Sequence, residues 1–150
     1  STYTRCDFED SFCDLIQSSE TLFGWTRTAG VPGLRQDHRN TSAHFLSLSP
    51  VGEKKITADL RSPVFLPSHS CQIRFHHHVG AAHGDLRILL QPHLAGQSTE
   101  VWKHSKQLQT EIWQRAVVNL SSNQSFQVCH NCKISSHGFD IEMDIAALIS

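Results

Sequence analysis

Hydrophobic and polar residues alternate along several short stretches of this chain, and the clearest alternation lies near its middle. Apolar side chains occupy every second position through most of residues 71–79, and the same period returns at residues 86–90. A period of two places successive side chains on opposite faces of a β-strand. Gly80 and Gly84 bracket the residues between the two stretches. We therefore predict a half-buried β-hairpin here, with other strands pairing along both of its edges.

Shorter runs of the same kind recur along the rest of the chain. They lie at residues 3–17, where a strand, a turn and a return are predicted, and at residues 45–49, 56–66, 100–103, 113–120, 126–129 and 139–145. Pro63 breaks the third run, since proline has no amide proton to give to a sheet. The best helical candidate, residues 144–149, is too short to be stable alone. Many short strands at regular spacing predict an all-β fold, a two-sheet antiparallel β-sandwich.

Length and composition narrow the classes of protein that fit this pattern. With 150 residues, 39% hydrophobic and 18% charged, residues 1–150 are expected to form one globular domain. A net charge of −1 offers no basic surface, so nucleic acid is not an expected partner. No apolar run approaches the ~20 residues of a membrane-spanning helix, so direct membrane insertion by this segment is not expected. The charged first residues do not resemble a signal peptide, and we expect a module excised from a larger multidomain protein.

The five cysteines include two closely spaced pairs. Cys6 and Cys13 are near enough for a hairpin-like loop to join their sulfurs in a disulfide; two unpaired buried thiols are the alternative. Cys129 and Cys132 allow a small local disulfide at a strand end, and two free thiols fit that spacing almost as well. Because the count is odd, one cysteine is free or has its partner outside this segment.

Three Asn-x-Ser/Thr sequons, at Asn40, Asn119 and Asn123, bear on the cellular compartment. Three acceptor sites in so short a chain favour a secreted or cell-surface glycoprotein. The 11 histidines add positive charge only under acidic conditions, so they also allow a surface whose association depends on pH.

Two clusters rich in histidine invite a zinc site. They are residues 76–78 with His83, and residues 129–132 with His137. A structural zinc needs four nitrogen or sulfur ligands in a tetrahedron. Neither cluster alone supplies a complete set, so we expect partly buried strand residues rather than metal ligands.

Motifs for catalysis are missing from the sequence. It contains no Gly-x-Ser-x-Gly, no His-Glu-x-x-His and no phosphate-binding glycine loop. We therefore expect no enzymatic activity and assign no catalytic residue. Trp25, Trp102 and Trp113 are expected in the core or at an end of the sandwich rather than in a ligand platform.

Spaced motifs along the whole chain carry a family resemblance. They are Cys6-Asp7-Phe8-Glu9 followed by Cys13, Phe23-Gly24-Trp25-Thr26-Arg27, His44-Phe45-Leu46, Ala58-x-Leu60-x-Ser62-Pro63, Cys71 with Phe75 and His78, Gly84-x-Leu86, Trp102 with Gln109, Trp113-x-x-Ala116-x-Val118-x-Leu120, Phe126-Gln127-Val128, and Asp140-Ile141-x-Met143-Asp144. Through them the chain resembles a MAM domain, an extracellular β-sandwich module of meprins, neuropilins and receptor tyrosine phosphatases. Many spaced positions occur in order, which makes the resemblance specific.

The resemblance implies a jelly-roll-like sandwich of two packed antiparallel sheets. It also implies a disulfide between Cys6 and Cys13. In the family the third cysteine, which is Cys71 here, pairs with a cysteine just past the last strand. Such a partner for Cys71 would lie outside this segment.

Some MAM domains bind Ca²⁺ or Na⁺ through acidic residues near the first and last strands. In this chain Glu9 and Asp144 match such positions, and calcium prefers six to eight oxygen ligands. Thr21, Leu22 and Ile145 stand where further ligands would be needed. No cofactor is therefore assigned, and Ca²⁺ or Na⁺ at Glu9 and Asp144 is a hypothesis that the resemblance raises.

Two functional hypotheses follow for an extracellular location. The first is a non-catalytic interaction module that serves cell adhesion, oligomerisation or ligand binding, with homophilic and other protein partners and with neighbouring domains of the same chain. The alternative is a metal-dependent, lectin-like β-sandwich that binds its ligand through histidines or acidic loops. A third possibility is a spacer that only positions its neighbours.

Overall fold

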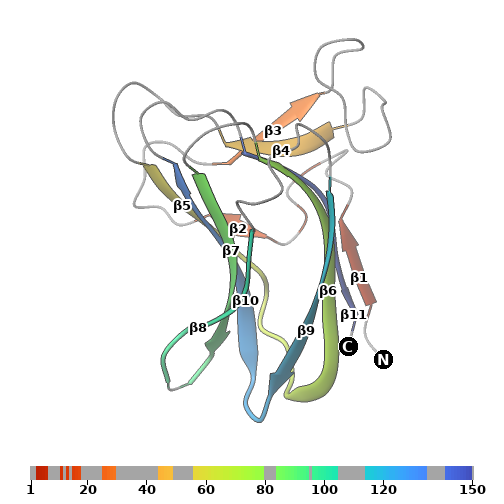
Figure 1. Ribbon diagram of the computed structural model, residues 1–150. Coiled ribbons are helices and arrows are strands. Elements are labelled where there is room, and N and C mark those ends of the chain that lie inside the picture. The colour runs from red at the N-terminus through yellow and green to blue at the C-terminus, as the bar shows by residue number, and fades with distance from the viewer. Residues whose placement is uncertain are drawn as a thin grey trace.

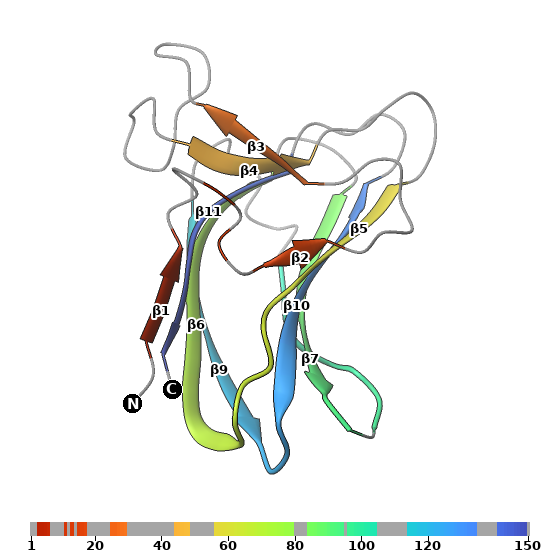
Figure 2. The ribbon, with the colours of Figure 1, turned by 180° about the vertical axis from the view of Figure 1, so that it is seen from behind.

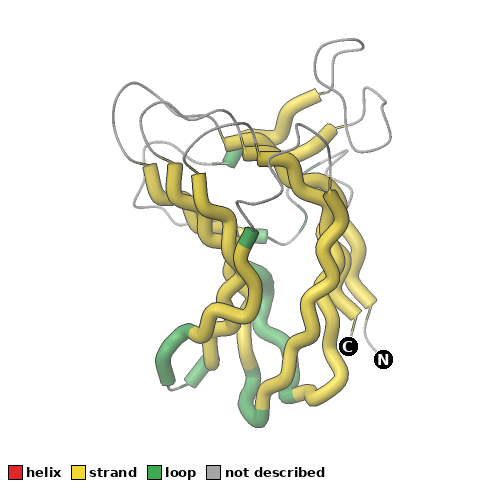
Figure 3. Tube along the Cα trace, in the orientation of Figure 1, coloured by secondary structure: helices red, strands yellow, loops and turns green. Residues whose placement is uncertain are grey.

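Strands make up nearly all of the regular structure of this chain (Figure 1). A computed structural model describes residues 3–6, 11, 13, 15–17, 25–29, 44–48, 56–79, 84–94, 96–104, 114–134 and 141–149. Within these ranges there are eleven strands and no helix (Figure 3). The predicted all-β class is confirmed.

One sheet has six strands in the order β3-β4-β11-β6-β9, with β1 also paired to β11. Its strands are β1 (Tyr3–Cys6), β3 (Thr26–Ala29), β4 (His44–Leu48), β6 (Ser68–Val79), β9 (Gln114–Ser122) and β11 (Ile141–Ile149). Every pairing in it is antiparallel. The pairing of β1 with β11 places the first and last strands side by side (Figure 1).

The other sheet has five strands in the order β2-β5-β10-β7-β8. Its strands are β2 (Ile16–Gln17), β5 (Ile56–Arg61), β7 (Gly84–Pro92), β8 (Thr99–Lys103) and β10 (Phe126–Ile134). These pairings are antiparallel as well. The two sheets face each other as layers of a sandwich, and tight turns such as that between β9 and β10 cross from one layer to the other (Figure 2).

The core lies between the two sheets and follows the period of two in the sequence. Along β9, for example, Ala116, Val118 and Leu120 are buried, whereas Val117 and Asn119 are exposed. Equivalent positions of the other long strands complete the core: Ala58, Leu60, Cys71, Ile73, Phe75, Leu86, Ile88, Leu90, Phe126 and Val128. Trp25 is buried in the same cluster and Trp102 packs against it, as predicted for two of the three tryptophans; Trp113 lies outside the described residues.

The predicted hairpin between residues 71–79 and 86–90 is wrong, although both of its strands exist. β6 pairs with β9 and β11 in the six-stranded sheet, whereas β7 pairs with β10 and β8 in the five-stranded sheet. Alternation specifies which face of a strand is buried, but it does not specify which strand lies alongside. The chain between β6 and β7 therefore connects the two layers.

Two smaller expectations concern short segments near the ends of the chain. The strand and return predicted at residues 3–17 appear as β1 and β2, which lie in different sheets and do not pair with each other. Residues 144–149, the best helical candidate, belong to strand β11. The predicted return at residues 3–17 is wrong because short segments take the structure that their tertiary partners impose, whereas the strand at residues 144–149 agrees with the expectation that this segment is too short for a stable helix.

Candidate functional site

A β-bulge in the pairing of β6 with β9 creates the candidate site. Ser68 pairs with Ser122 and Cys71 pairs with Leu120, so two residues of β6 lie opposite the single residue Ser121 of β9. A bulge of this kind bends its strand and re-aims side chains, and bulges are frequent next to binding sites.

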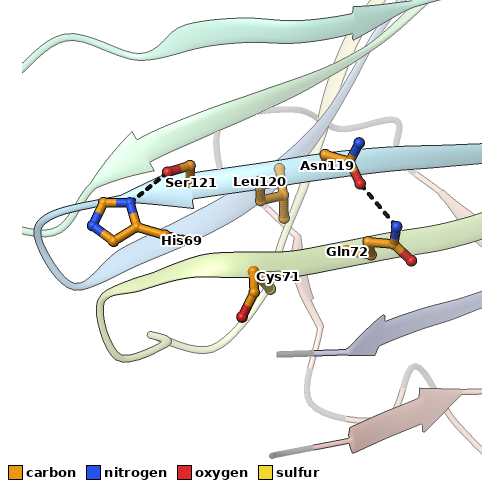
Figure 4. Close-up of a pocket in the computed structure, with 7 residues that line it drawn as sticks. His69, Cys71, Gln72, Asn119, Leu120 and Ser121 are labelled. Carbon is orange, nitrogen blue, oxygen red and sulfur yellow. Dashed lines mark hydrogen bonds between the residues drawn. The ribbon is translucent and has the colours of Figure 1, made fainter.

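The bulge borders an open hollow of about 320 Å³ (Figure 4). Its lining residues are His69, Ser70, Cys71, Gln72, Asn119, Leu120 and Ser121. The volume lies near the lower end of the range for small-molecule sites, roughly 300–1,000 Å³. We refer to it as the bulge hollow.

Two side-chain hydrogen bonds between the strands organise the bulge hollow (Figure 4). Nδ1 of His69 lies 2.7 Å from Oγ of Ser121, and Nε2 of Gln72 donates to Oδ1 of Asn119 over 2.8 Å. The Arg74 guanidinium adds bonds of 3.3 and 3.0 Å to Oε1 of Gln72. The result is a polar rim with amide and imidazole groups and one nearby positive charge.

The contact between His69 and Ser121 does not amount to a catalytic dyad. A nucleophilic serine needs a base that a third group orients, together with donors for an oxyanion. None of the seven lining residues is an aspartate or glutamate. Both side chains also lie on the exposed surface, where water competes for the bond. The arrangement is suited to polar contact with a ligand or a covalent glycan.

Of the predicted sequons, Asn119 lies on the rim of the bulge hollow and Asn123 lies beyond it, in the turn between β9 and β10. Both side chains are exposed. Ser121, the hydroxyl residue of the Asn119 sequon, is exposed too. Asn40 lies outside the described residues. The structure thus brings one predicted glycosylation site to the candidate site and leaves a second at a turn tip.

Cys71 is a free thiol that is only 1% exposed, at the inner side of the bulge hollow. Burial raises the pKa of this thiol, which favours its neutral form. Gln72 pairs with Ile149, so the end of β11 runs directly beside this part of β6.

Cys129 is also a free buried thiol, so the Cys129–Cys132 disulfide, one of the two alternatives for this pair, is not formed. Strand β10 is continuous through both residues, and its pairing with β7 has no irregularity there. Three steps along an extended strand span about 10 Å, whereas a disulfide needs Cα atoms less than about 7 Å apart.

The environment of Cys129 suppresses its ionisation. Burial, with the nearby Asp59 carboxylate adding to it, raises the pKa of the thiol to about 11, while Arg61 acts in the opposite direction. Reactive cysteines have lowered pKa values and accessible sulfurs. Cys129 is therefore a structural thiol.

Cys13 is engaged in a disulfide. Its backbone has a positive φ of 57°, and its amide donates to Oγ of Ser11 over 2.9 Å. Cys6 is the last residue of β1, and its side chain lies outside the described part. The pairing of Cys6 with Cys13 stays a prediction.

An imidazole pair links the two sheets at a second place. Nδ1 of His104, just after β8, lies 3.2 Å from Nε2 of His77 on β6. His77 is 3% exposed and has edge-on ring contacts with Trp102 and His104 at 5.1 and 5.3 Å. Phe75 joins the same cluster through Trp102. The sequence prediction of a partly buried strand histidine holds for His77, but its link to His104 was not foreseen.

The hypothesised metal sites find no support in the described part of the chain. There, no group of three or more His, Cys, Asp or Glu side chains is placed to hold a metal ion. Glu9, His83 and His137 lie outside the described residues, as do the side chains of Asp144 and Cys132. The cation hypothesis for Glu9 and Asp144 therefore stays a prediction.

Sequence reasoning identified Asn119 and Cys71 but missed the residues that join them into one site. His69, Gln72 and Ser121 become neighbours only through the pairing of β6 with β9 and its bulge. The sequence held one signal for this site, the polar run at residues 68–70. It lies just before the alternation of residues 71–79 and marks where the regular strand pattern begins.

Comparison with known proteins places this chain among β-sandwich modules. A family model described as MAM domain, meprin/A5/mu, matches residues 6–148. No helix among the described residues is long and apolar enough to cross a lipid bilayer.

Solved structures of similar fold include adhesin and carbohydrate-binding domains. The K1 cleaved adhesin domain of Lys-gingipain from Porphyromonas gingivalis W83 matches with a TM-score of 0.75 and 10% identity, over 100% of this chain and 99% of that domain. The module TmCBM61, solved in complex with β-1,4-galactotriose, matches with a TM-score of 0.63 and 12% identity, over 92% and 89%. A mutant of the family 29 carbohydrate-binding module CBM29-2 matches with a TM-score of 0.59 and 14% identity, over 98% and 91%. At such low identity these matches establish the sandwich fold.

Proposed function

Because the chain belongs to the MAM domain family, we propose that it is a non-catalytic, extracellular interaction module of a larger surface or secreted protein. It serves adhesion or oligomerisation, with protein partners that include a second copy of itself and neighbouring domains of the same chain. The observation that carries this proposal is the family match over residues 6–148, nearly the whole chain.

The chemistry of the described residues supports binding rather than catalysis. The bulge hollow pairs Ser121 with His69 but offers no carboxylate among its lining residues. His77 is buried against aromatic rings, where a substrate has no access. Exposed sheet faces, edges and turns remain for partner binding, as is usual for modules whose scaffold is rigid.

An extracellular setting fits the cysteine and sequon chemistry. Cys13 takes part in a disulfide, and such bonds persist in oxidising compartments. We take Cys6 as its partner, and we take the exposed Asn119 and Asn123 as glycan acceptors. With this disulfide and with glycans at these positions, the domain would be a disulfide-bonded glycoprotein.

Cys71 fits the same picture. Its thiol is free here, and the pairing of Gln72 with Ile149 brings the end of β11 beside it. We propose that a cysteine following Ser150 in the parent chain bonds to Cys71. This pairing would fasten the end of the domain to β6.

A second candidate function is lectin-like binding, with a metal ion as its cofactor. The observation that favours it is the shared fold with carbohydrate-binding modules. Sugar-binding pockets are usually lined with aromatic side chains, whereas none of the large hydrophobics exposed on the described surface is aromatic. Protein binding is therefore the first choice.

One experiment separates these functions. Secreted protein is immobilised on beads, and bead clustering, binding to cells and binding to a glycan array are each measured with and without EDTA. We expect clustering or cell binding that EDTA leaves unchanged, and no glycan binding. Glycan binding that EDTA abolishes would favour the lectin, and a protein that binds none of these would contradict the proposal.

A further inference from the structure

Among the described strands, β9 is the longest that lies at the edge of a sheet. It has nine residues, and its only strand partner in the described part of the chain is β6. An edge strand presents backbone N–H and C=O groups to any second strand, so proteins usually blunt such edges.

The other described edges carry the usual protective features. β2, β1 and β3 have two, four and four residues, too short to offer a long pairing surface. β8 has five residues, carries the charged Glu100 and Lys103, and pairs with β7 through an irregular register.

β9 has none of these features over most of its length. It pairs with β6 through seven consecutive residues, from Gln114 to Leu120, before the bulge interrupts the register. The strand contains no proline, and Arg115 is its only charged residue. Val117, at the midpoint of the regular stretch, has 46% of its surface exposed.

We infer that β9 pairs with β9 of a second copy of this chain, antiparallel and about a two-fold axis through Val117. Strand addition at an exposed sheet edge is a common mode of recognition, and two-fold symmetry is the commonest for self-association. Because Val117 is the midpoint of the regular stretch, this register pairs all seven residues.

The side chains match in this register. On the outer face the two Val117 side chains meet, and each Arg115 lies opposite an Asn119. On the inner face Ala116 lies opposite Val118, and these small apolar side chains continue the buried face of the sheet. The two Arg115 side chains are separated by four residues of strand, about 13 Å, so salt largely screens their repulsion.

The contact is weak for a single pair of molecules. A seven-residue edge with few projecting side chains buries less than the roughly 1,200 Å² typical of stable complexes. Many copies on one surface compensate for this through avidity. The inference therefore deepens the proposed function and rests on its homophilic form.

The first test is sedimentation velocity of the folded protein over a range of concentrations that extends to its solubility limit, because the contact is weak, after glycosidase treatment trims any carbohydrate at Asn119. Val117→Lys places two ammonium groups at the axis and should weaken dimer formation by about tenfold or more. Val64→Lys is the matched control, since Val64 is 44% exposed and lies outside every strand. It should leave dimer formation unchanged.

A covalent trap tests the register without relying on affinity. With Val117→Cys, the two thiols lie opposite each other in the dimer, and mild oxidation should yield a disulfide-linked dimer. Arg115→Cys faces Asn119 of the other copy and should yield none. Cys71 and Cys129 are buried and should not interfere.

The outcomes separate this inference from the proposed function. Self-association that survives Val117→Lys, or cross-linking through Arg115→Cys but not Val117→Cys, overturns the β9 pairing and leaves the interaction module intact. A protein that stays monomeric yet binds other cells overturns both the β9 pairing and the homophilic form, and leaves the interaction module intact. Concentration-dependent dimers that Val117→Lys dissolves and Val117→Cys traps support the inference.

Discussion

Ser62 and Val128 hold each other through two hydrogen bonds, one of which uses the serine side chain. The Ser62 amide donates to the Val128 carbonyl over 2.9 Å, and the Val128 amide donates to Oγ of Ser62 over 2.8 Å. The hydroxyl in turn donates to the carbonyl of Pro63 over 2.9 Å. Both residues are buried, at 5% and 0% exposed. This contact lies where strand β5 ends, just before the proline. It gives the backbone amide and carbonyl of Val128 in β10 their hydrogen-bond partners.

Replacing Ser62 with alanine should therefore destabilise the sandwich. The Val128 amide would stay buried without its acceptor, which costs about 1–3 kcal/mol. Urea unfolding monitored by tryptophan fluorescence measures the change in the free energy of unfolding. Ser70→Ala, at an exposed serine of β6, is the control and should change it by less than about 0.5 kcal/mol. Equal effects of the two substitutions would contradict the structural role given to Ser62.

The Ser62 contact illustrates which parts of the fold the sequence can specify. The alternation of residues 71–79 correctly predicted the buried face of β6, because burial follows directly from side-chain polarity. Pro63 correctly marked the end of β5. The partner of β6, however, depends on contacts between distant segments, and local pattern carries no signal for them.

The candidate site, like the fold, was predictable from the sequence only in its local features. Asn119 was recognisable from its sequon, and its side chain is exposed. The bulge that places it beside Gln72 and His69 depends on one extra residue in β6 relative to β9. Such a register shift becomes visible only when the two strands are aligned in space.

The imidazole pair of His77 and His104 should contribute measurably to stability. His104→Ala removes the ring whose Nδ1 lies 3.2 Å from Nε2 of the buried His77, and leaving a buried group without its hydrogen-bond partner costs about 1–3 kcal/mol. His104→Asn should recover much of this loss, because the asparagine amide reaches about as far as Nδ1 of histidine. Thermal unfolding at neutral pH measures both variants.

The control for this pair is His93→Ala. The His93 side chain is exposed, and its amide donates to the carbonyl of Ser125, a bond that alanine preserves. We expect a change below about 0.5 kcal/mol. If His104→Ala were as mild as this control, the link between the sheets at His77 would carry little of the stability.

The sequons at Asn119 and Asn123 should each carry a glycan in protein secreted from animal cells. Both acceptors are exposed, so a folded domain accommodates the sugar at either position. Asn119→Gln and Asn123→Gln should each lower the intact mass by one glycan, and the double substitution by two. Glycosidase treatment of the unaltered protein should remove these two glycans together with any glycan at Asn40. An unchanged mass for either single variant would remove that residue as an acceptor.

The Cys129 thiol should make the domain less stable at alkaline pH. Its pKa is raised from 9.0 to about 11, chiefly by burial and then by Asp59. Between these two values the unfolded chain loses the proton while the folded chain keeps it, so stability falls as pH rises through this window and is unaffected below it. From about pH 8 to about pH 10 the loss is about 1.3 kcal/mol.

Cys129→Ala isolates this effect, because the two proteins differ at no other ionisable group. Urea unfolding at the two pH values should show a steeper loss of stability for the unaltered protein, by about 1.3 kcal/mol. Thiol labelling at neutral pH adds a second readout: neither Cys129 nor Cys71 should react until the protein is unfolded, because both are buried and free. Parallel pH profiles together with rapid labelling of the folded protein would mean that Cys129 is accessible, contrary to its 4% exposure.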